Sequence, residues 1–294
     1  MKRTAFTMIE LIFVIVIMGI IGKFGTEFLA QAYESFIFSN TNNKLQARSA
    51  KTVEFIASRL ENRIKDSVIA RQTPAGTPEG IGSVSATTNY TVLEWISADI
   101  DGFRGTTKPY WSSILDLDAS SATTLVSPDT NTTAIDGLIR MLSNNGSNIS
   151  NAAIYFIGSN SDINSYGYAS GLSDQSGAIH PINANAGTPA LNDFVSSIAG
   201  KDFTGVDLYE YYKLAWTANA IVWTPANGGT LTYYYDYQPW NKKQLGNANT
   251  KSAVLMEGIS TFQFMSIGSI MKIQVCAGDD LVEDYSLCKE KTIF

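Results

Sequence analysis

The chain has 294 residues, a net charge of -6 and only 16% charged residues. This charge argues against a broad nucleic-acid-binding surface, because phosphate binding requires a concentration of Lys and Arg that no segment here provides. The polar residues are mostly Asn, Ser, Thr and Gly, a balance common in exported β-rich proteins. We therefore expect one sizeable folded domain of about 220 residues behind an extended N-terminal element.

An apolar segment near the N-terminus predicts a membrane span. Lys2 and Arg3 precede a run without charge from Leu11 to Gly22. A helix over residues 6–21 would be about 24 Å long, slightly short of a 30 Å hydrocarbon core unless the Lys23 amine reaches back to the interface. Positive charge before the run predicts a cytoplasmic N-terminus, with the bulk of the chain on the other side of the membrane.

A carboxylate lies at the start of this apolar segment. An ionised Glu10 in the hydrocarbon region costs several kcal/mol unless a positive charge neutralises it. The segment Lys2-Arg-Thr-Ala-Phe-Thr-Met-Ile-Glu-Leu11 resembles the type III (prepilin) signal of type IV pilins and type II secretion pseudopilins. The resemblance implies cleavage by a prepilin peptidase between Ala5 and Phe6, methylation of the new amine, and pairing of Glu10 with the Phe6 amine of a neighbouring subunit. Ala5 stands where the family usually has Gly.

The resemblance also implies a fold class and a set of partners. We expect an α+β, pilin-like fold, in which a long N-terminal helix packs on an antiparallel β-sheet domain and its first half spans the membrane. The expected divisions are a leader (1–5), a transmembrane and filament-core half of the helix (6–28), an amphipathic half (29–72) and a periplasmic β-rich domain with a C-terminal disulfide loop (73–294). The implied partners are other pilin or pseudopilin subunits, a prepilin peptidase, an inner-membrane assembly platform and the lipid bilayer. The implied location is the bacterial inner membrane, with extraction into a surface filament as a further expectation.

Helical periodicity continues beyond the membrane. One apolar stripe recurs at three- and four-residue steps and should cover a sheet. Its members are Val53, Ile56, Ala57, Leu60, Ile64 and Val68. The spacing predicts one helix of about 65 residues that ends near Arg71-Gln72, before Thr73-Pro74, with a candidate bend at residues 39–43. Glu27 stands where many major pilins have a helix-kinking proline. Cleavage of an ordinary signal peptide after residues 30–32 is the alternative interpretation.

The remaining chain predicts an antiparallel β domain. Strands are expected at residues 90–96, 153–157, 208–217, 221–224, 231–237, 255–264 and 270–275, with a short element at 135–142. Residues 225–229 and Gly268-Ser269 read as hairpin turns, and residues 159–189 as a long surface excursion with His180 in a loop. The tyrosines between 209 and 237 favour sheet packing, with sugar or base stacking as the alternative. In the family context, residues 206–276 resemble the larger minor pseudopilins of the J type or PilW-like minor pilins.

Both cysteines lie near the end of the chain. Cys276 and Cys288 have eleven residues between them, which does not fit a zinc knuckle and favours a disulfide worth about 3 kcal/mol in an oxidising compartment. Two unpaired thiols in a reducing cytosol are the alternative. The loop between the cysteines contains a candidate calcium site, which could equally be a solvated acidic turn because its spacing matches no regular calcium loop. Its carboxylates are Asp279, Asp280, Glu283 and Asp284. Asp99 and Asp101 form a second acidic group, and no other cofactor is expected.

No catalytic motif is present in the sequence. His180 has no motif partner, and the chain has no HExxH, no Gly-x-Ser-x-Gly and no phosphate-binding Gly-rich loop after a strand, so we expect no enzyme. The sequence predicts a minor pilin or pseudopilin of a type II secretion or type IV pilus system, which primes or caps a periplasmic or surface filament. The alternative is a membrane-tethered protein that binds glycans or cell surfaces and uses the prepilin-like helix only as an anchor.

Overall fold

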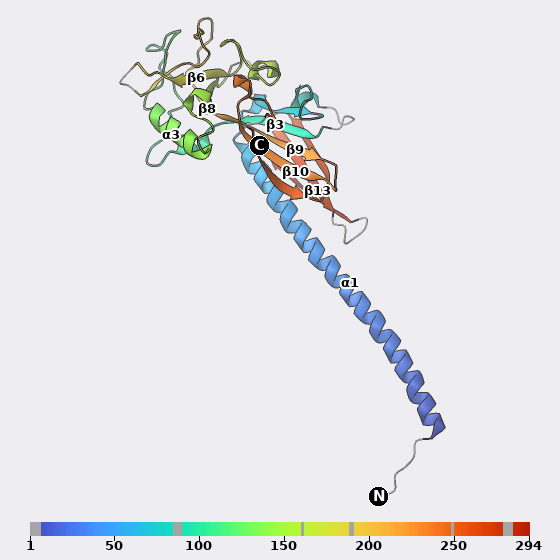
Figure 1. The fold of residues 1–294 in the computed structure, drawn as a ribbon. Helices are drawn as coiled ribbons and strands as arrows, with labels where there is room; N and C mark the ends of the chain where they lie inside the picture. Colours follow the sequence, from blue (N-terminus) through green and yellow to red (C-terminus); the bar gives the residue numbers. More distant parts are fainter. Residues whose placement is uncertain (1–6, 85–89, 160–161, 188–190, 248–249, 279–284) are drawn as a thin grey trace.

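A single long helix forms the stem of the molecule, with all the sheets gathered at its C-terminal end (Figure 1). The computed structural model describes residues 7–84, 90–159, 162–187, 191–247, 250–278 and 285–294. Helix α1 (Met8–Glu61) begins at Thr7, whose hydroxyl caps the first turn, and runs without interruption through residues 39–43. The candidate bend is therefore absent, because Thr41 and Leu45 are buried against the domain and hold this stretch in the helix.

Helix α1 ends ten residues earlier than the sequence predicted, at Glu61 instead of Arg71-Gln72. Ile64 and Val68 are buried, as the apolar stripe requires, but both have extended backbone. The Ile64 amide donates to the Ile96 carbonyl (2.9 Å), so the chain has already entered sheet pairing. Residues four apart, such as Ile64 and Val68, lie on one face of a helix and also on one face of a strand, so the apolar pattern fits both structures. Backbone hydrogen bonds to the sheet select the extended conformation here.

A six-stranded antiparallel sheet covers the end of the stem. Its order is β11-β10-β9-β3-β1-β2. The strands are β1 (Ile69–Arg71), β2 (Glu79–Gly80), β3 (Val92–Ser97), β9 (Thr217–Thr224), β10 (Thr230–Tyr237) and β11 (Lys251–Glu257). The predicted hairpin around residues 225–229 is confirmed as β9–β10, but residues 212–215 of its expected first arm belong to another sheet. The turn places Gly229 at a positive φ where a Cβ would lie 1.8 Å from the Ile259 carbonyl oxygen.

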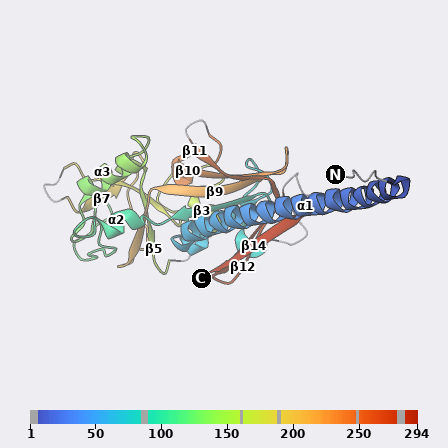
Figure 2. The same ribbon diagram turned by 90° about the horizontal axis from the view of Figure 1, so that it is seen from below.

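A three-stranded sheet packs one face against the stem (Figure 2). Its order is β12 (Ile259–Ile267), β13 (Ile270–Gly278) and β14 (Ser286–Ile293), all antiparallel. The β12–β13 pair was predicted, and β14 was not. Three contacts fix the strands along the stem: Tyr285 to Asn42 (2.8 Å), Lys291 to Glu54 (2.6 Å) and Arg63 to the Ser269 carbonyl (2.6 Å).

Residues 98–216, here called the distal lobe, are inserted between two paired strands. β3 and β9 pair up to Ser97 and Thr217, so both ends of the lobe lie side by side. A five-stranded sheet forms its centre, in the order β4 (Leu125–Val126), β7 (Asp193–Ser196), β6 (His180–Ala184), β5 (Ala153–Phe156) and β8 (Tyr212–Ala215), with helices α2 (Ile100–Arg104) and α3 (Thr132–Leu142). The lobe lies beyond the C-terminal end of α1, far from the N-terminus (Figure 1).

Five short 3-10 turns complete the described elements. They are η1 (Lys65–Ser67), η2 (Ile81–Ser83), η3 (Ile149–Asn151), η4 (Ile163–Tyr166) and η5 (Pro239–Asn241).

Two elements of the distal lobe differ from, or are more definite than, the sequence prediction. His180 is buried in β6 and is not in a loop, while the short element expected at 135–142 is helix α3.

Three apolar clusters hold these parts together. One lies between α1 and the sheets around Ile56 and Leu60, a second joins the six-stranded sheet to the distal lobe around Tyr237 and Trp240, and a third lies within the lobe around Phe156. Strand β5 separates the last two, because Tyr155 contributes to one cluster and its neighbour Phe156 to the other. Tyr212, Tyr233 and Tyr237 are buried, which confirms sheet packing for these members of the tyrosine series.

Candidate membrane-anchoring and assembly helix

The first half of α1 has no covering from its own chain. Of the helices that the structure describes, α1 is the one long and apolar enough to cross a membrane. Its apolar side chains are exposed from Met8 to Phe38, apart from the half-buried Ile37, whereas full burial against the domain begins at Thr41. Residues 8–28 alone are about 31 Å long, which matches the hydrocarbon core of a bilayer. The stem is therefore built to place its apolar surface in lipid or against other helices.

Glu10 lies at the start of this exposed apolar stretch and belongs to a capping box with Thr7. The Thr7 amide and hydroxyl donate to Glu10 Oε2 (3.0 and 2.9 Å), and the Glu10 amide donates to Thr7 Oγ1 (3.4 Å). Within the described part of the chain, no cationic side chain lies within ion-pair distance of Glu10. The carboxylate thus caps its own helix while its charge stays uncompensated by these residues.

The processing site predicted at Ala5 and Phe6 lies outside the described residues, as do the calcium candidates Asp279, Asp280, Glu283 and Asp284.

Other polar groups of the stem are satisfied within the helix. The Thr26 hydroxyl donates to the Lys23 carbonyl (2.9 Å), and Lys23 lies 4.0 Å from Glu27 one turn on. Both of these charged side chains are exposed, so the pair contributes a few tenths of a kcal/mol at most. Thr26, Lys23 and Glu27 thus have partners within the helix, whereas Glu10 is a charged side chain for which the described residues provide no ion pair.

The disulfide predicted between Cys276 and Cys288 is confirmed. The two residues face each other directly on β13 and β14, so the bridge joins neighbouring strands at the ends nearer the exposed apolar half of α1. Tyr285 beside it contacts the stem, with its ring 5.1 Å from that of Phe38. The bridge therefore stabilises the part of the sheet that holds the stem just above its exposed apolar half.

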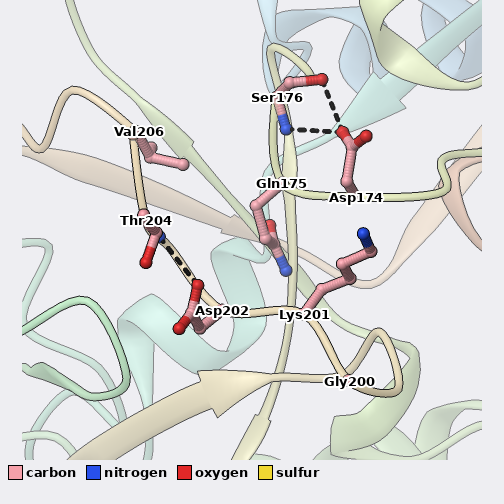
Figure 3. A pocket seen from close by; sticks show the side chains of 9 residues that line it. Asp174, Gln175, Ser176, Gly200, Lys201, Asp202, Thr204 and Val206 are labelled. Carbon is pink, nitrogen blue, oxygen red and sulfur yellow. Dashed lines mark hydrogen bonds between the residues drawn. The ribbon is translucent and has the colours of Figure 1, made fainter.

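The distal lobe has a polar pocket of about 530 Å³ between two surface turns (Figure 3). Asp174 accepts hydrogen bonds from the Ser176 hydroxyl and amide, and Asp202 accepts one from the Thr204 amide, which lowers the pKa of both carboxyls below the ordinary value. Each carboxylate is thus held in its own turn. Among the described residues there is no group of three or more His, Cys, Asp or Glu side chains able to hold a metal ion. This pocket was not predicted from the sequence, because its lining residues come from two separate segments, 174–176 and 200–206, and form no motif.

The burial of four charged or titratable side chains, Asp99, His180, Arg71 and Glu94, was not predicted from the sequence. Burial raises the pKa of Asp99, the N-cap of α2, to about 6, and lowers the pKa of His180 to about 4. Arg71 and Glu94 form a buried ion pair (2.8 Å), and Glu94 also accepts from the Tyr237 hydroxyl (2.9 Å). These groups lie within packed parts of the fold and none lines the described pocket. We assign them structural roles.

Comparison of the chain with protein-family models, with curated proteins and with solved structures finds no match. A long apolar N-terminal helix packed on antiparallel sheets is an architecture consistent with that of pilins. The confirmed disulfide between strands adds a feature suited to an oxidising compartment.

Proposed function

We propose that this chain is a minor pilin or pseudopilin, a non-enzymatic subunit that primes or caps a filament of a type II secretion or type IV pilus system. The observation that carries the proposal is the stem: about 31 Å of exposed apolar helix whose first turn contains Glu10, a carboxylate that forms no ion pair with any described residue. The prepilin-like segment from Lys2 to Leu11 indicates the source of a positive charge for Glu10. Cleavage before Phe6 would free a charged amine, and the Phe6 amine of one subunit would pair with Glu10 of its neighbour. Partners of the proposed subunit are its sister subunits, the prepilin peptidase and the inner-membrane assembly platform.

The distal lobe supports a place at the filament end. It widens the molecule at the end of the stem far from the membrane helix (Figure 1). Close helical repetition along a thin filament becomes harder as the head of each subunit grows, whereas a subunit at the tip has free space above it. In this proposal the N-terminus is cytoplasmic, and the domain is periplasmic until the subunit is extracted.

Mass spectrometry of the mature N-terminus tests the processing step. The expected species begins with an N-methylated Phe6 and lacks the first five residues. A chain that keeps Met1 and still reaches the membrane would contradict the proposal and favour a simple tether.

Two substitutions at Glu10 separate charge from helix capping. Gln keeps a side-chain oxygen that can complete the capping box, whereas Ala removes it. If the charge recruits the subunit, Glu10→Gln and Glu10→Ala both lose incorporation into filaments, while cleavage and membrane insertion remain. Normal incorporation of the Gln variant would show that capping is the function of Glu10.

A membrane-tethered binding protein is the second candidate, and the distal lobe is the observation that favours it. Across its sheet, Ile114, Tyr211 and Ile157 lie on adjacent strands or bridges and are between 41% and 52% exposed. A surface of this kind suits contact with another molecule. A chain with an intact leader that binds glycans or cell surfaces in the absence of any filament would support this candidate.

A further inference from the structure

The outer face of the three-stranded sheet ends in a row of exposed apolar side chains. Ile267 pairs with Ile270, and the register of Met271 with Ile293 places Phe294 opposite Ile270 on the third strand. Their exposed fractions are 71%, 39% and 77%. The opposite face of the same strands is packed against the stem, so the row points away from the protein. An apolar row of this length crossing a sheet is a candidate interface.

Next to the apolar row lies a pair of opposite charges. Lys272 and Glu290 form an ion pair (2.8 Å), and their side chains are 45% and 54% exposed. Lys272 is aligned with Thr292 on the neighbouring strand and reaches diagonally to Glu290. β13 and β14 pair over eight residues without a shift in register, so this face is regular.

The strands run along the stem, which sets the height of this face above a membrane. Contacts of the sheet follow α1 from Asn42 through Glu54 to Arg63, which lies just beyond the end of the helix. The apolar row lies at the level of Arg63, because the Ser269 carbonyl beside it accepts from that guanidinium. Two copies anchored in one bilayer by their stems would therefore present their rows at the same height and in the same orientation.

We propose that the outer faces of two copies of this chain pack together about a two-fold axis that is parallel to the stems and lies between β13 and β14. This axis places β13 of each copy opposite β14 of the other. Ile270 then packs against Phe294 of the partner subunit. Lys272 then lies diagonally across the interface from Glu290 of the partner subunit, two residues along the strand, in the same register relation that it has to its own Glu290.

A second copy suits this face for two physical reasons. The face is self-complementary in charge, since two Lys272–Glu290 pairs brought together form an alternating group of four charges. The row is too small to hold a dimer in free solution, but anchoring in a common bilayer raises the effective concentration of the copies. The pairing requires only the membrane span and does not depend on the proposed pilin function.

A mixed-charge experiment tests the axis directly. Full-length chains with two different tags are co-expressed and extracted from membranes in mild detergent, and recovery of one tag with the other is measured. In Lys272→Glu all four charges of the dimer are negative, and in Glu290→Lys all four are positive, so each variant should lose self-association. Co-expression of Lys272→Glu with Glu290→Lys restores alternation across the interface only, since the pair within each chain stays broken. We expect about tenfold higher recovery for this mixture than for either variant alone.

Two further variants separate the apolar row from general effects. Ile270→Asp should abolish recovery, whereas Val254→Asp, at a 60% exposed position on β11 of the other sheet, should leave it unchanged. Absence of self-association of the unmodified chain in membranes would overturn the proposal. Equal recovery for the mixture and for the single variants, or equal loss for Ile270→Asp and Val254→Asp, would overturn it as well.

Discussion

Asp99 shows how one buried carboxyl can oppose stability at neutral pH. Its side chain caps α2 by accepting from the Gly102 amide (3.1 Å), but burial raises its pKa from 3.8 to about 6. A raised carboxyl pKa stabilises the folded state below about pH 4, and this contribution is lost as the pH rises through 6. Above pH 6 the ionised group is held in an unfavourable site.

Asp99→Asn should therefore stabilise the protein at pH 7 by about 1–2 kcal/mol, because the amide keeps a cap oxygen without the charge. Asp99→Ala is the matched control: it also removes the charge but loses the cap, and it should gain less. Urea unfolding at pH 7 and pH 5 measures both. A gain of Asp99→Asn that is equally large at pH 5 would contradict the role of ionisation.

His180 acts in the opposite direction over the same pH range. Burial lowers its pKa from 6.5 to about 4, with its ring 5.0 Å from that of Phe156. The unfolded chain binds a proton below pH 6.5 and the folded chain does not, so this group costs stability as the pH falls from 6.5 to 4. His180→Gln should remove that acid-side loss. Chemical unfolding at pH 7, 6 and 5 should show a flatter or rising stability for the variant, and an unchanged slope would exclude His180 as the cause.

At the scale of elements, the disulfide between β13 and β14 should contribute to the free energy of unfolding of the sheet that packs on the stem. Simultaneous Cys276→Ser and Cys288→Ser substitution removes the cross-link and should lower the free energy of unfolding by about 3 kcal/mol. The pairing of β13 with β14 should persist, because their hydrogen bonds and the Lys291–Glu54 contact remain. The measurement is unfolding of the double variant beside the unmodified chain with and without reductant, and the reduced unmodified chain should match the variant.

The sequence was a good guide to elements whose pattern depends on local chemistry. The apolar stem, the β9–β10 hairpin around its glycine turn and the β12–β13 pair all follow from periodicity and turn residues. β14 was missed because Lys289, Glu290 and Lys291 interrupt any apolar alternation, and its inward lysine reaches a carboxylate on the stem. The end of α1 was misplaced because long-range pairing to Ile96 decided it.

Of the two candidate assembly surfaces, Glu10 could be predicted from the sequence and the outer face of β12–β14 could not. Glu10 stands out in sequence because a carboxylate beside an apolar run is unusual, and the structure adds its capping of the helix through Thr7. The outer face of β12–β14 could not be recognised, because which side chains face outward depends on the register of three strands and on the stem that covers the other face.

At the scale of the whole molecule, the six-stranded sheet and the distal lobe share one of the three apolar clusters, the one around Tyr237 and Trp240. The ends of the distal lobe meet at Ser97 and Thr217, which is the arrangement of an inserted domain, and the lobe has an apolar cluster of its own. Yet Tyr168 of the lobe donates from its hydroxyl to the Ser67 carbonyl (2.6 Å) and accepts at its carbonyl from Arg71 (3.1 Å). We therefore expect the lobe and the six-stranded sheet to unfold together.

The Arg71–Glu94 pair is the place to test this coupling, since it lies in the six-stranded sheet and contacts the lobe. Both side chains are buried, and burial raises the pKa of the Glu94 carboxyl despite the nearby guanidinium. Arg71→Ala would leave an unpaired buried carboxyl and lose the bond to Tyr168, so we expect a loss of about 3–5 kcal/mol. Replacement of both partners, as Arg71→Met with Glu94→Leu, removes the unpaired charge and should recover most of that loss.

Hydrogen exchange distinguishes coupled from independent lobes. If the lobes form one cooperative unit, Arg71→Ala lowers the protection of β3 and of the lobe strand β5 by the same free energy, because both exchange through the same global unfolding. The double replacement should restore protection in both strands together. Loss of protection in β3 alone, with β5 unchanged, would mean that the distal lobe folds around its own cluster without support from the six-stranded sheet.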